Sequence, residues 1–190
     1  MKKIVILAGL LASLCVAGEV FATSATLEFQ SIDNVPVKTT DQTNFNFTVR
    51  ENVLKNLTGD VQFSQTNSDG TQGLSSSRIE TGWTPTYTIN EYFRLYARET
   101  IGEKYTSTTH NSYWSAEPGV TIPFGSTNLT AKLAWRFRTG FSDTALDTTR
   151  TWRVGLAYAV TSKDTIGVRY DRVQGNSDQR IMAVNYTRGF

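Results

Sequence analysis

From Thr23 to the end of the chain, apolar and polar residues alternate in segments of about ten residues, separated by polar turn residues. The segment 128–141 shows the pattern best. One face carries Leu129, Ala131, Leu133, Trp135 and Phe137, and the other carries Thr130, Lys132, Ala134, Arg136, Arg138 and Gly140. A period of two indicates β-strands with one apolar and one polar face, and repeated segments of this length are typical of a transmembrane barrel.

Ten segments follow this pattern: 25–33, 43–50, 58–66, 76–85, 88–101, 110–123, 127–141, 149–161, 164–174 and 178–190. Longer polar connections follow the odd-numbered segments, and mostly tight joins follow the even-numbered ones. This alternation is typical of barrels whose termini both lie in the periplasm. The pattern therefore predicts an all-β, antiparallel up-and-down transmembrane barrel of about ten strands, with twelve as the alternative. Pro118 and Gly119 fall within one segment and predict a bulge there.

Large aromatic residues share the apolar parity of their segments and are expected to face lipid. They are Trp83, Trp114, Trp135, Trp152, Phe29, Phe45, Phe47, Phe63, Phe93, Phe137, Tyr158, Tyr170, Tyr186 and Phe190. Aromatic girdles at both membrane interfaces mark such barrels. A soluble β-sandwich core also favours aromatics, but it would not need an opposite face so rich in arginine.

Residues 1–22 are expected to be a cleaved signal peptide, which leaves 23–190 as a single barrel domain. Lys2 and Lys3 form its positive region, residues 4–18 are apolar, and Val20-Phe21-Ala22 resembles a cleavage site. A transmembrane helix would need about 20 apolar residues. Cleavage would remove Cys15, the single cysteine, so the mature chain could form no disulfide.

The polar face of the strands carries the candidate functional residues. We expect the following to line the lumen: Arg50, Arg78, Arg94, Arg98, Lys132, Arg136, Arg138, Arg153, Arg169 and Tyr96. Five acids share that face: Glu28, Asp60, Glu80, Glu117 and Asp171. The excess of cations predicts passive conduction of small anionic solutes, because arginine binds carboxylates in a bidentate way. The rival interpretation is a filled structural or adhesive barrel, in which arginine–carboxylate pairs only neutralise buried charge.

Several short runs resemble the oligogalacturonate-specific porin (KdgM-like) family of bacterial outer-membrane barrels. They are Tyr92-Phe93-Arg94-Leu95-Tyr96-Ala97-Arg98, Ser115-Ala116-Glu117-Pro118-Gly119, Leu133-Ala134-Trp135-Arg136-Phe137-Arg138 and Val168-Arg169-Tyr170. The resemblance implies a bacterial outer-membrane location, a twelve-stranded barrel and arginines that line a channel for acidic oligosaccharides. This chain departs from the family in length, since only ten segments are found.

The last nine residues, 182–190, resemble the C-terminal signature that the barrel assembly machinery recognises in outer-membrane proteins. Tyr186 and the terminal Phe190 lie at its apolar positions. Arg188 breaks the alternation and is expected to extend its charge to the membrane interface. The expected partners are therefore outer-membrane lipids, this machinery and a small anionic solute, for a monomer or weak oligomer.

Enzymatic function is not expected, although one motif suggests an alternative. His110 and Ser112 share one face of a segment, which faintly resembles an outer-membrane phospholipase, but no orienting residue for the histidine is evident. No cysteine–histidine cluster predicts a metal site, and no motif predicts a cofactor. Without Lys2, Lys3 and Glu19, 17 basic and 16 acidic residues remain, which gives no indication of nucleic-acid binding.

The terminal aromatic provides a first test. Phe190→Ala removes the feature that we expect the assembly machinery to recognise, so it should strongly reduce the amount of folded barrel in the outer membrane. Heat-modifiable electrophoretic mobility measures that amount. A wild-type yield of folded barrel from Phe190→Ala would contradict the C-terminal signal.

Overall fold

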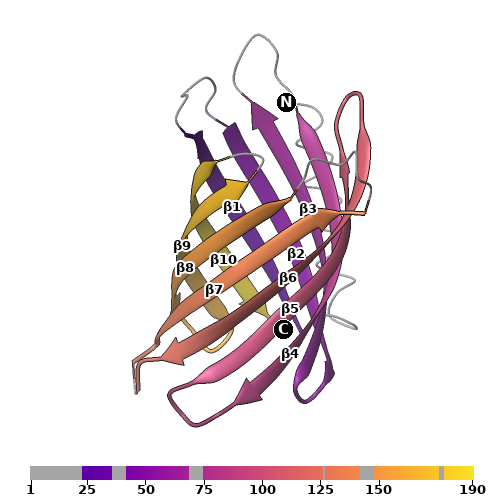
Figure 1. Cartoon of the computed structure of the whole chain (residues 1–190). Helices are drawn as coiled ribbons and strands as arrows, with labels where there is room; N and C mark the ends of the chain where they lie inside the picture. Colours follow the sequence, from indigo (N-terminus) through magenta and orange to yellow (C-terminus); the bar gives the residue numbers. More distant parts are fainter. Residues whose placement is uncertain (1–22, 36–41, 69–74, 126, 142–147, 176–177) are drawn as a thin grey trace.

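In a computed structural model, the chain forms one closed barrel of ten antiparallel strands (Figure 1). The structure describes residues 23–35, 42–68, 75–125, 127–141, 148–175 and 178–190, so the expected signal peptide lies outside it. The strands are β1 (Ser24–Asn34), β2 (Gln42–Leu54), β3 (Leu57–Ser68), β4 (Ser76–Thr88), β5 (Arg94–Tyr105), β6 (His110–Pro123), β7 (Leu129–Gly140), β8 (Thr149–Ala159), β9 (Asp164–Gly175) and β10 (Gln179–Gly189). Each strand pairs with its neighbours in sequence, and β1 pairs with β10 to close the sheet. The predicted up-and-down barrel of ten strands is confirmed, and the alternative of twelve is wrong for this chain.

The closing pair sets the two ends of the barrel. Ser24 at the start of β1 lies opposite Gly189 at the end of β10, so the first strand begins and the last strand ends at the same end of the barrel. We name this the termini end. We name the opposite end the loop end; there β1 ends at Asn34 and β2 begins at Gln42.

The predicted boundaries lie within four residues of the observed ones except around the fifth strand. That strand was expected at 88–101, but β4 continues to Thr88 and β5 spans Arg94–Tyr105. Asn90 explains the shift, because its side-chain oxygen accepts hydrogen bonds from the backbone N–H groups of Tyr92 and Phe93, each at 2.9 Å. Asparagine side chains favour such turns. Phe93 therefore lies in a turn and not in the barrel wall.

The predicted bulge at Pro118 is wrong. The pairs Ala116–Phe137 and Gly119–Ala134 keep a single register across β6 and β7, although the pairing is interrupted between them. A similar interruption without a register shift falls between β4 and β5, at Thr84 and Pro85. Proline supplies no N–H to a ladder. Pro85 and Pro118 therefore explain why the pairing is interrupted at these two places.

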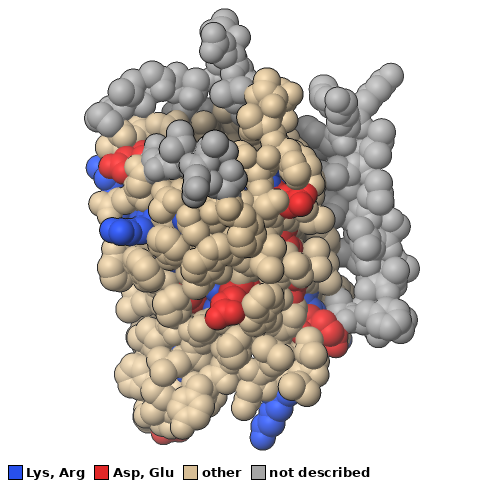
Figure 2. Space-filling model, turned by 45° about the vertical axis from the view of Figure 1, so that its right-hand side comes forward, with Lys and Arg blue, Asp and Glu red and all other residues tan. Residues whose placement is uncertain are grey.

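The outer wall is apolar and the interior is polar, which reverses the arrangement in a soluble protein. Exposed side chains include Phe29 at 63%, Trp152 at 61% and Val184 at 60%, whereas the most deeply buried groups include Glu117 and Asp171. All four tryptophans lie on the outward parity, and Phe47 shares that parity but is only 6% exposed. Figure 2 shows one face of the wall, where uncharged residues cover most of the described surface. Within the described residues, no helix is long and apolar enough to span a membrane.

A polar contact joins the last two strands at the termini end. The Asp164 carboxylate accepts hydrogen bonds from the Tyr186 hydroxyl at 2.6 Å and from Arg188 Nη1 at 2.8 Å. Arg188 was expected to extend toward the membrane interface, but it is paired instead. The residue that breaks the C-terminal alternation is thus neutralised within the wall.

Adjacent residues on β3 test the assignment of the two faces. Val61 faces outward and is 52% exposed, whereas Gln62 faces the interior opposite Glu80. Val61→Arg should destabilise the barrel in lipid vesicles by about 2–4 kcal/mol, the cost of arginine near the bilayer midplane. Gln62→Arg should cost clearly less, because a carboxylate lies opposite. Urea unfolding followed by tryptophan fluorescence measures both, and equal costs would contradict the assignment.

Candidate functional site: the barrel interior

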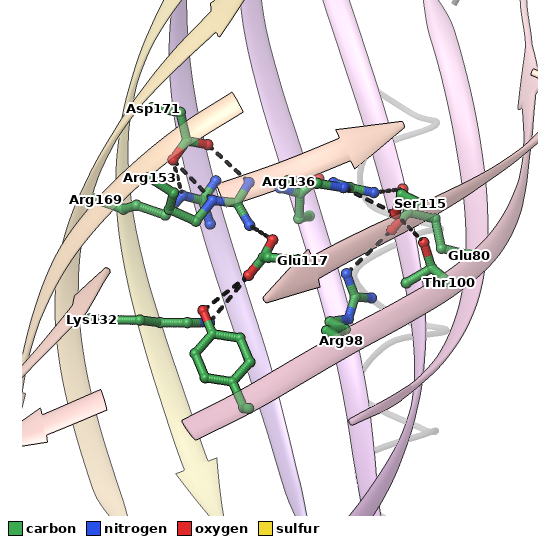
Figure 3. A network of polar contacts seen from close by, with 12 residues as sticks. Glu80, Arg98, Thr100, Ser115, Glu117, Lys132, Arg136, Arg153, Arg169 and Asp171 are labelled. Atoms are coloured by element: carbon green, nitrogen blue, oxygen red, sulfur yellow. Dashed lines mark hydrogen bonds and ion pairs between the residues drawn. The ribbon is translucent and has the colours of Figure 1, made fainter. Parts of the chain in front are cut away.

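Among the residues that the structure describes, five carboxylates lie inside the barrel, and each is buried and paired with a cation. Their exposures range from 1% for Asp171 to 7% for Glu28. They fall into two clusters, shown in part in Figure 3. The first cluster contains Glu28, Glu117, Asp171, Arg153, Arg169 and Lys132. The second contains Asp60, Glu80, Arg98 and Arg136.

Arg153 on β8 forms the centre of the first cluster. Its Nη1 donates to Glu117 Oε2 at 2.5 Å, while Nε and Nη2 donate to the two oxygens of Asp171 at 3.0 Å each. Arg169 on β9 joins Asp171 at 3.0 Å to Glu28 at 2.5 Å. Bidentate pairs of this kind are geometrically specific, and this cluster connects β1, β6, β8 and β9 across the lumen.

Arg98 on β5 holds the second cluster together. It donates to both oxygens of Asp60, at 3.0 and 2.5 Å, and lies 3.5 Å from Glu80. Arg136 on β7 contacts Glu80 at 3.1 Å and also donates to the Ser115 hydroxyl at 3.1 Å. Asp60 on β3, Glu80 on β4 and Ser115 on β6 therefore hold the guanidinium groups of both arginines in place.

Two inward tyrosines complete the clusters. The Tyr96 hydroxyl donates to Glu117 at 3.3 Å, and the Tyr113 hydroxyl donates to Glu80 at 2.6 Å. Each ring lies against a glycine of a neighbouring strand: the Tyr96 ring occupies the space that a side chain at Gly119 would need. Lys132 lies 4.4 Å from the Tyr96 ring centroid, within the range of a cation–π contact.

The two clusters form a narrow, charge-balanced waist. Three acids meet three cations in the first cluster, and two acids meet two cations in the second. Side chains of Arg98, Arg136 and Arg153 are only 12–13% exposed. The waist therefore leaves little room for water, and its pairs largely cancel one another.

A cavity of about 350 Å³ lies between this waist and the loop end. Its lining includes Arg78, Lys104 and Arg138, from β4, β5 and β7, which belong to neither cluster. Arg78 lies directly opposite Lys104 in the ladder, and the Arg138 guanidinium lies 5.2 Å from the Tyr113 ring centroid. Neutral amides and hydroxyls line the other side, from β1, β2 and β3: Gln30, Gln42, Asn44, Asn46, Gln62, Ser64 and Thr66.

Two of the cations expected in the lumen lie away from this cavity. Arg50 donates to the Thr26 hydroxyl at 3.0 Å, between the waist and the termini end. Arg94 is the first residue of β5 and is exposed at the termini end. The predicted lumen residues do not include Lys104, because the predicted fifth strand ends at residue 101 whereas β5 extends to Tyr105. The sequence analysis also did not single out Glu99, an acid on the outward face of β5. Its parity with the apolar residues Leu95 and Ile101 is the signal that could have identified it.

The histidine–serine motif lies on the outer wall. His110 Nε2 lies 3.5 Å from Glu103 Oε2, and its ring stacks on Tyr105 with 5.2 Å between centroids. Ser112 lies opposite Glu103 in the ladder, but in the described part of the chain His110 contacts the carboxylate and not this hydroxyl. A hydrolytic site would need the serine and histidine in contact. Among the described residues, no group of three His, Cys, Asp or Glu could hold a metal ion.

Comparisons with known proteins identify the fold. No protein-family model and no curated sequence matches the chain. Among solved structures, the NanC porin is 10% identical, with a TM-score of 0.57 over 86% of this chain and 100% of that chain. The COG4313 outer membrane channel from Pseudomonas putida F1 is 13% identical, with a TM-score of 0.53 over 90% and 96% of the two chains. The KdgM porin in complex with disordered oligogalacturonate is 10% identical, with a TM-score of 0.52 over 88% and 99%. The suspected KdgM-like porins are thus among the structures that this chain resembles, and at these identities the similarity establishes a shared barrel fold.

Arg153 tests the energetic role of the waist. Arg153→Met leaves Glu117 and Asp171 buried with fewer partners, and removal of one member of a buried pair typically costs about 3–5 kcal/mol. We therefore expect a large decrease in the free energy of unfolding in lipid vesicles, measured by urea titration. Arg150→Met is the matched control, because Arg150 is exposed on the outward face of the same strand. A similar small effect for both would show that the waist is solvated.

Proposed function

We propose that this chain is an outer-membrane porin that admits small anionic solutes from the loop end. The observation that carries the proposal is the position of Arg78, Lys104 and Arg138 together in the lining of the loop-end cavity. Rings and walls of arginine and lysine favour anions in pores. Transport would be passive and would need no cofactor.

The neighbours of Arg78 support an anion in this cavity. Arg78 and Lys104 are cross-strand partners on the cavity wall. Arg78 Nε is buried and has no hydrogen-bond acceptor within the described residues. A carboxylate from a solute would supply that acceptor, in the charge-assisted form that guanidinium favours.

The other wall of the cavity suggests the class of solute. Amide and hydroxyl side chains such as Asn44, Gln62 and Ser64 present donors and acceptors to neutral polar groups. A small acidic sugar carries hydroxyls as well as a carboxylate, so it would match both walls. The KdgM porin structure contains oligogalacturonate, and we extend that solute class to this chain as part of the proposal.

Passage beyond the cavity requires the waist to open. An entering carboxylate could replace Glu117 or Glu80 as the partner of one arginine, because each displaced acid keeps another cation: Lys132 for Glu117, and the second of Arg98 and Arg136 for Glu80. This exchange suits small solutes, because the clusters extend across the lumen. The solute would meet Arg50 and then Arg94 as it leaves at the termini end.

The apolar outer wall supports a location in the bacterial outer membrane. Aromatic and aliphatic side chains dominate the exposed surface of the strands, as lipid contact requires. Outer-membrane lipids and the barrel assembly machinery are accordingly the proposed partners, the latter through Tyr186 and Phe190.

A filled structural barrel is the second candidate, and the waist favours it. All five inward carboxylates are neutralised inside the protein, with exposures of at most 7%. Complete internal pairing needs no solute, and such networks also fix the conformation of narrow interiors. The two candidates differ in whether ions cross the barrel.

Reversal potentials in a potassium chloride gradient across a planar bilayer distinguish them. We expect a small conductance with anion preference for the wild type. The double variant Arg78→Gln/Arg138→Gln should lower the anion-to-cation permeability ratio by roughly fivefold, equivalent to about 1 kcal/mol of lost interaction with a solvated charge.

The matched control is Arg150→Gln/Arg180→Gln, which removes the same charge from exposed, outward positions near the loop end. Its selectivity should equal that of the wild type. A folded wild-type barrel without current would reject the porin and leave the filled barrel. Unchanged selectivity in the cavity variant would reject the role of the cavity cations.

A further inference from the structure

A groove of about 380 Å³ lies on the outer wall of the barrel, where β1, β10 and β9 are neighbours. Its outward lining is almost entirely apolar and consists of Phe29, Ser31, Val168, Met182 and Val184. Phe29 lies opposite Val184 in the ladder, and Val184 lies opposite Val168, so the groove crosses all three strands. The outer wall of a membrane barrel contacts lipid tails, and a groove can hold one tail in a fixed position.

Two arginines lie on the loop-end side of this groove. On the outward face of β10, Val184 and Met182 are followed toward the loop end by Arg180. On β9, Arg172 lies directly opposite Arg180 and faces outward with it. Arg150 on β8 is diagonal to Arg172 and adds a third cation beside the pair. The outer wall therefore changes from apolar to basic just above Met182, which is the order of chemistry along a lipid from its tails to its headgroup.

Much of the hydrogen-bonding capacity of the two arginines is unused. Arg172 Nη2 lies 3.6 Å from Asp178 Oδ2, but Arg172 Nη1 is buried and has no acceptor within the described residues. Arg180 is exposed and forms no ion pair in the described part of the chain, although Asp33 lies opposite it on β1. A guanidinium group carries several N–H donors in a planar fork. Two neighbouring guanidinium groups can therefore bind one phosphate from two sides.

Trp152 indicates that the arginines lie at the level of lipid headgroups. It faces outward on β8, directly opposite Arg172, and is one of the most exposed side chains of the wall. Tryptophan is enriched at membrane–water interfaces. Long cationic side chains at that level extend their charge into the headgroup region, where phosphates lie.

Outward lysine and arginine side chains near the loop end are confined to β8, β9 and β10 among the described residues. Elsewhere at that end the outward positions are neutral or acidic, as at Thr43, Ser77 and Glu103. General contact with a lipid surface would not require cations in one sector alone. A phosphate held at the head of one groove accounts for this asymmetry.

We propose that this groove, together with Arg172 and Arg180, is a binding site for a phosphorylated membrane lipid. One acyl chain lies along Met182 and Val184, and the phosphate accepts hydrogen bonds from both guanidinium groups. We name this the lipid site. The proposal rests on the membrane location in the proposed function. It is independent of conduction, because the lipid site lies on the outer wall and none of its outward side chains faces the lumen.

The combination of groove and arginines selects a lipid over a free phosphate ion. A free ion would use Arg172 and Arg180 and leave the apolar groove unoccupied, whereas a phosphorylated lipid supplies both the acceptor and the tail. Its phosphate would give the buried Arg172 Nη1 an acceptor and would offset the repulsion between two cations that lie directly opposite each other.

Native mass spectrometry tests the lipid site in the folded barrel, purified in detergent and incubated with bisphosphorylated lipid A. We expect the wild type to retain one lipid A molecule. Arg172→Gln/Arg180→Gln should weaken the apparent affinity by at least about tenfold, comparable to the loss of a hydrogen bond to a charged group. Lys55→Gln/Lys163→Gln is the matched control, because it removes the same charge from exposed turns at the termini end. It should retain lipid A as the wild type does.

Further arms separate the phosphate from the tail. Lipid A without its phosphates should bind clearly more weakly, and inorganic phosphate alone should not displace lipid A. Val168→Trp places a large ring in the groove and should reduce retention. Val154→Trp is its control, since Val154 is also 49% exposed on the outward face but lies outside the groove, and it should have no effect.

Heat-modifiable mobility must show a folded barrel for each variant, which separates loss of the lipid site from loss of the fold. Absence of the wild-type barrel from the outer membrane would overturn both this proposal and the proposed function. With folded barrels, any of the following would overturn the lipid site alone. They are no lipid A retained by the wild type, full retention by Arg172→Gln/Arg180→Gln or Val168→Trp, an equal loss in either control, equal binding of the phosphate-free lipid, and displacement of lipid A by inorganic phosphate. None of these results bears on the reversal potentials that test the porin.

Discussion

Closure of the sheet governs everything else in this molecule. A strand edge exposed to lipid would leave a row of N–H and C=O groups without partners, and each such group is costly in hydrocarbon. The pairing of β1 with β10, from Ser24–Gly189 to Asn34–Gln179, removes both edges. Once the barrel is closed, alternate strand residues must face either outward or into the lumen, so the period-two pattern fixes the face of each strand residue. The polar contact of Asp164 with Tyr186 and Arg188 lies at the end of that closing strand.

The small circumference then determines the interior. Ten strands bring opposite walls close enough for Arg153 and Arg169 to connect β1, β6, β8 and β9. Buried charges in such a space need partners, and the five acids supply them. Three other cations, Arg78, Lys104 and Arg138, line the cavity toward the loop end. In the proposed function, anions are recognised in the cavity and their passage is limited at the waist.

The sequence predicted the fold well because alternation is a local property. Strand number, parity and the inward position of Arg98, Arg136 and Arg153 all follow from counting in steps of two. Other features depend on information that alternation does not contain. The turn made by Asn90 moved β5 by several residues, so Lys104 joined the wall and the cavity. Whether Arg138 or Arg136 meets Glu80 depends on register between strands, which no single segment reveals. Pro118 was expected to force a bulge, but the ladder tolerates it by omitting a pair.

The charge balance of the waist has a consequence for how the barrel responds to electrical force. A transmembrane potential does work only on net charge that moves through it, about 2.3 kcal/mol per elementary charge per 100 mV. Each cluster contains equal numbers of acids and cations, so an arginine and a carboxylate that shift together carry no gating charge. Movements that keep each pair together are therefore insensitive to voltage, and in the proposed mechanism the waist opens when a solute carboxylate competes for the arginines.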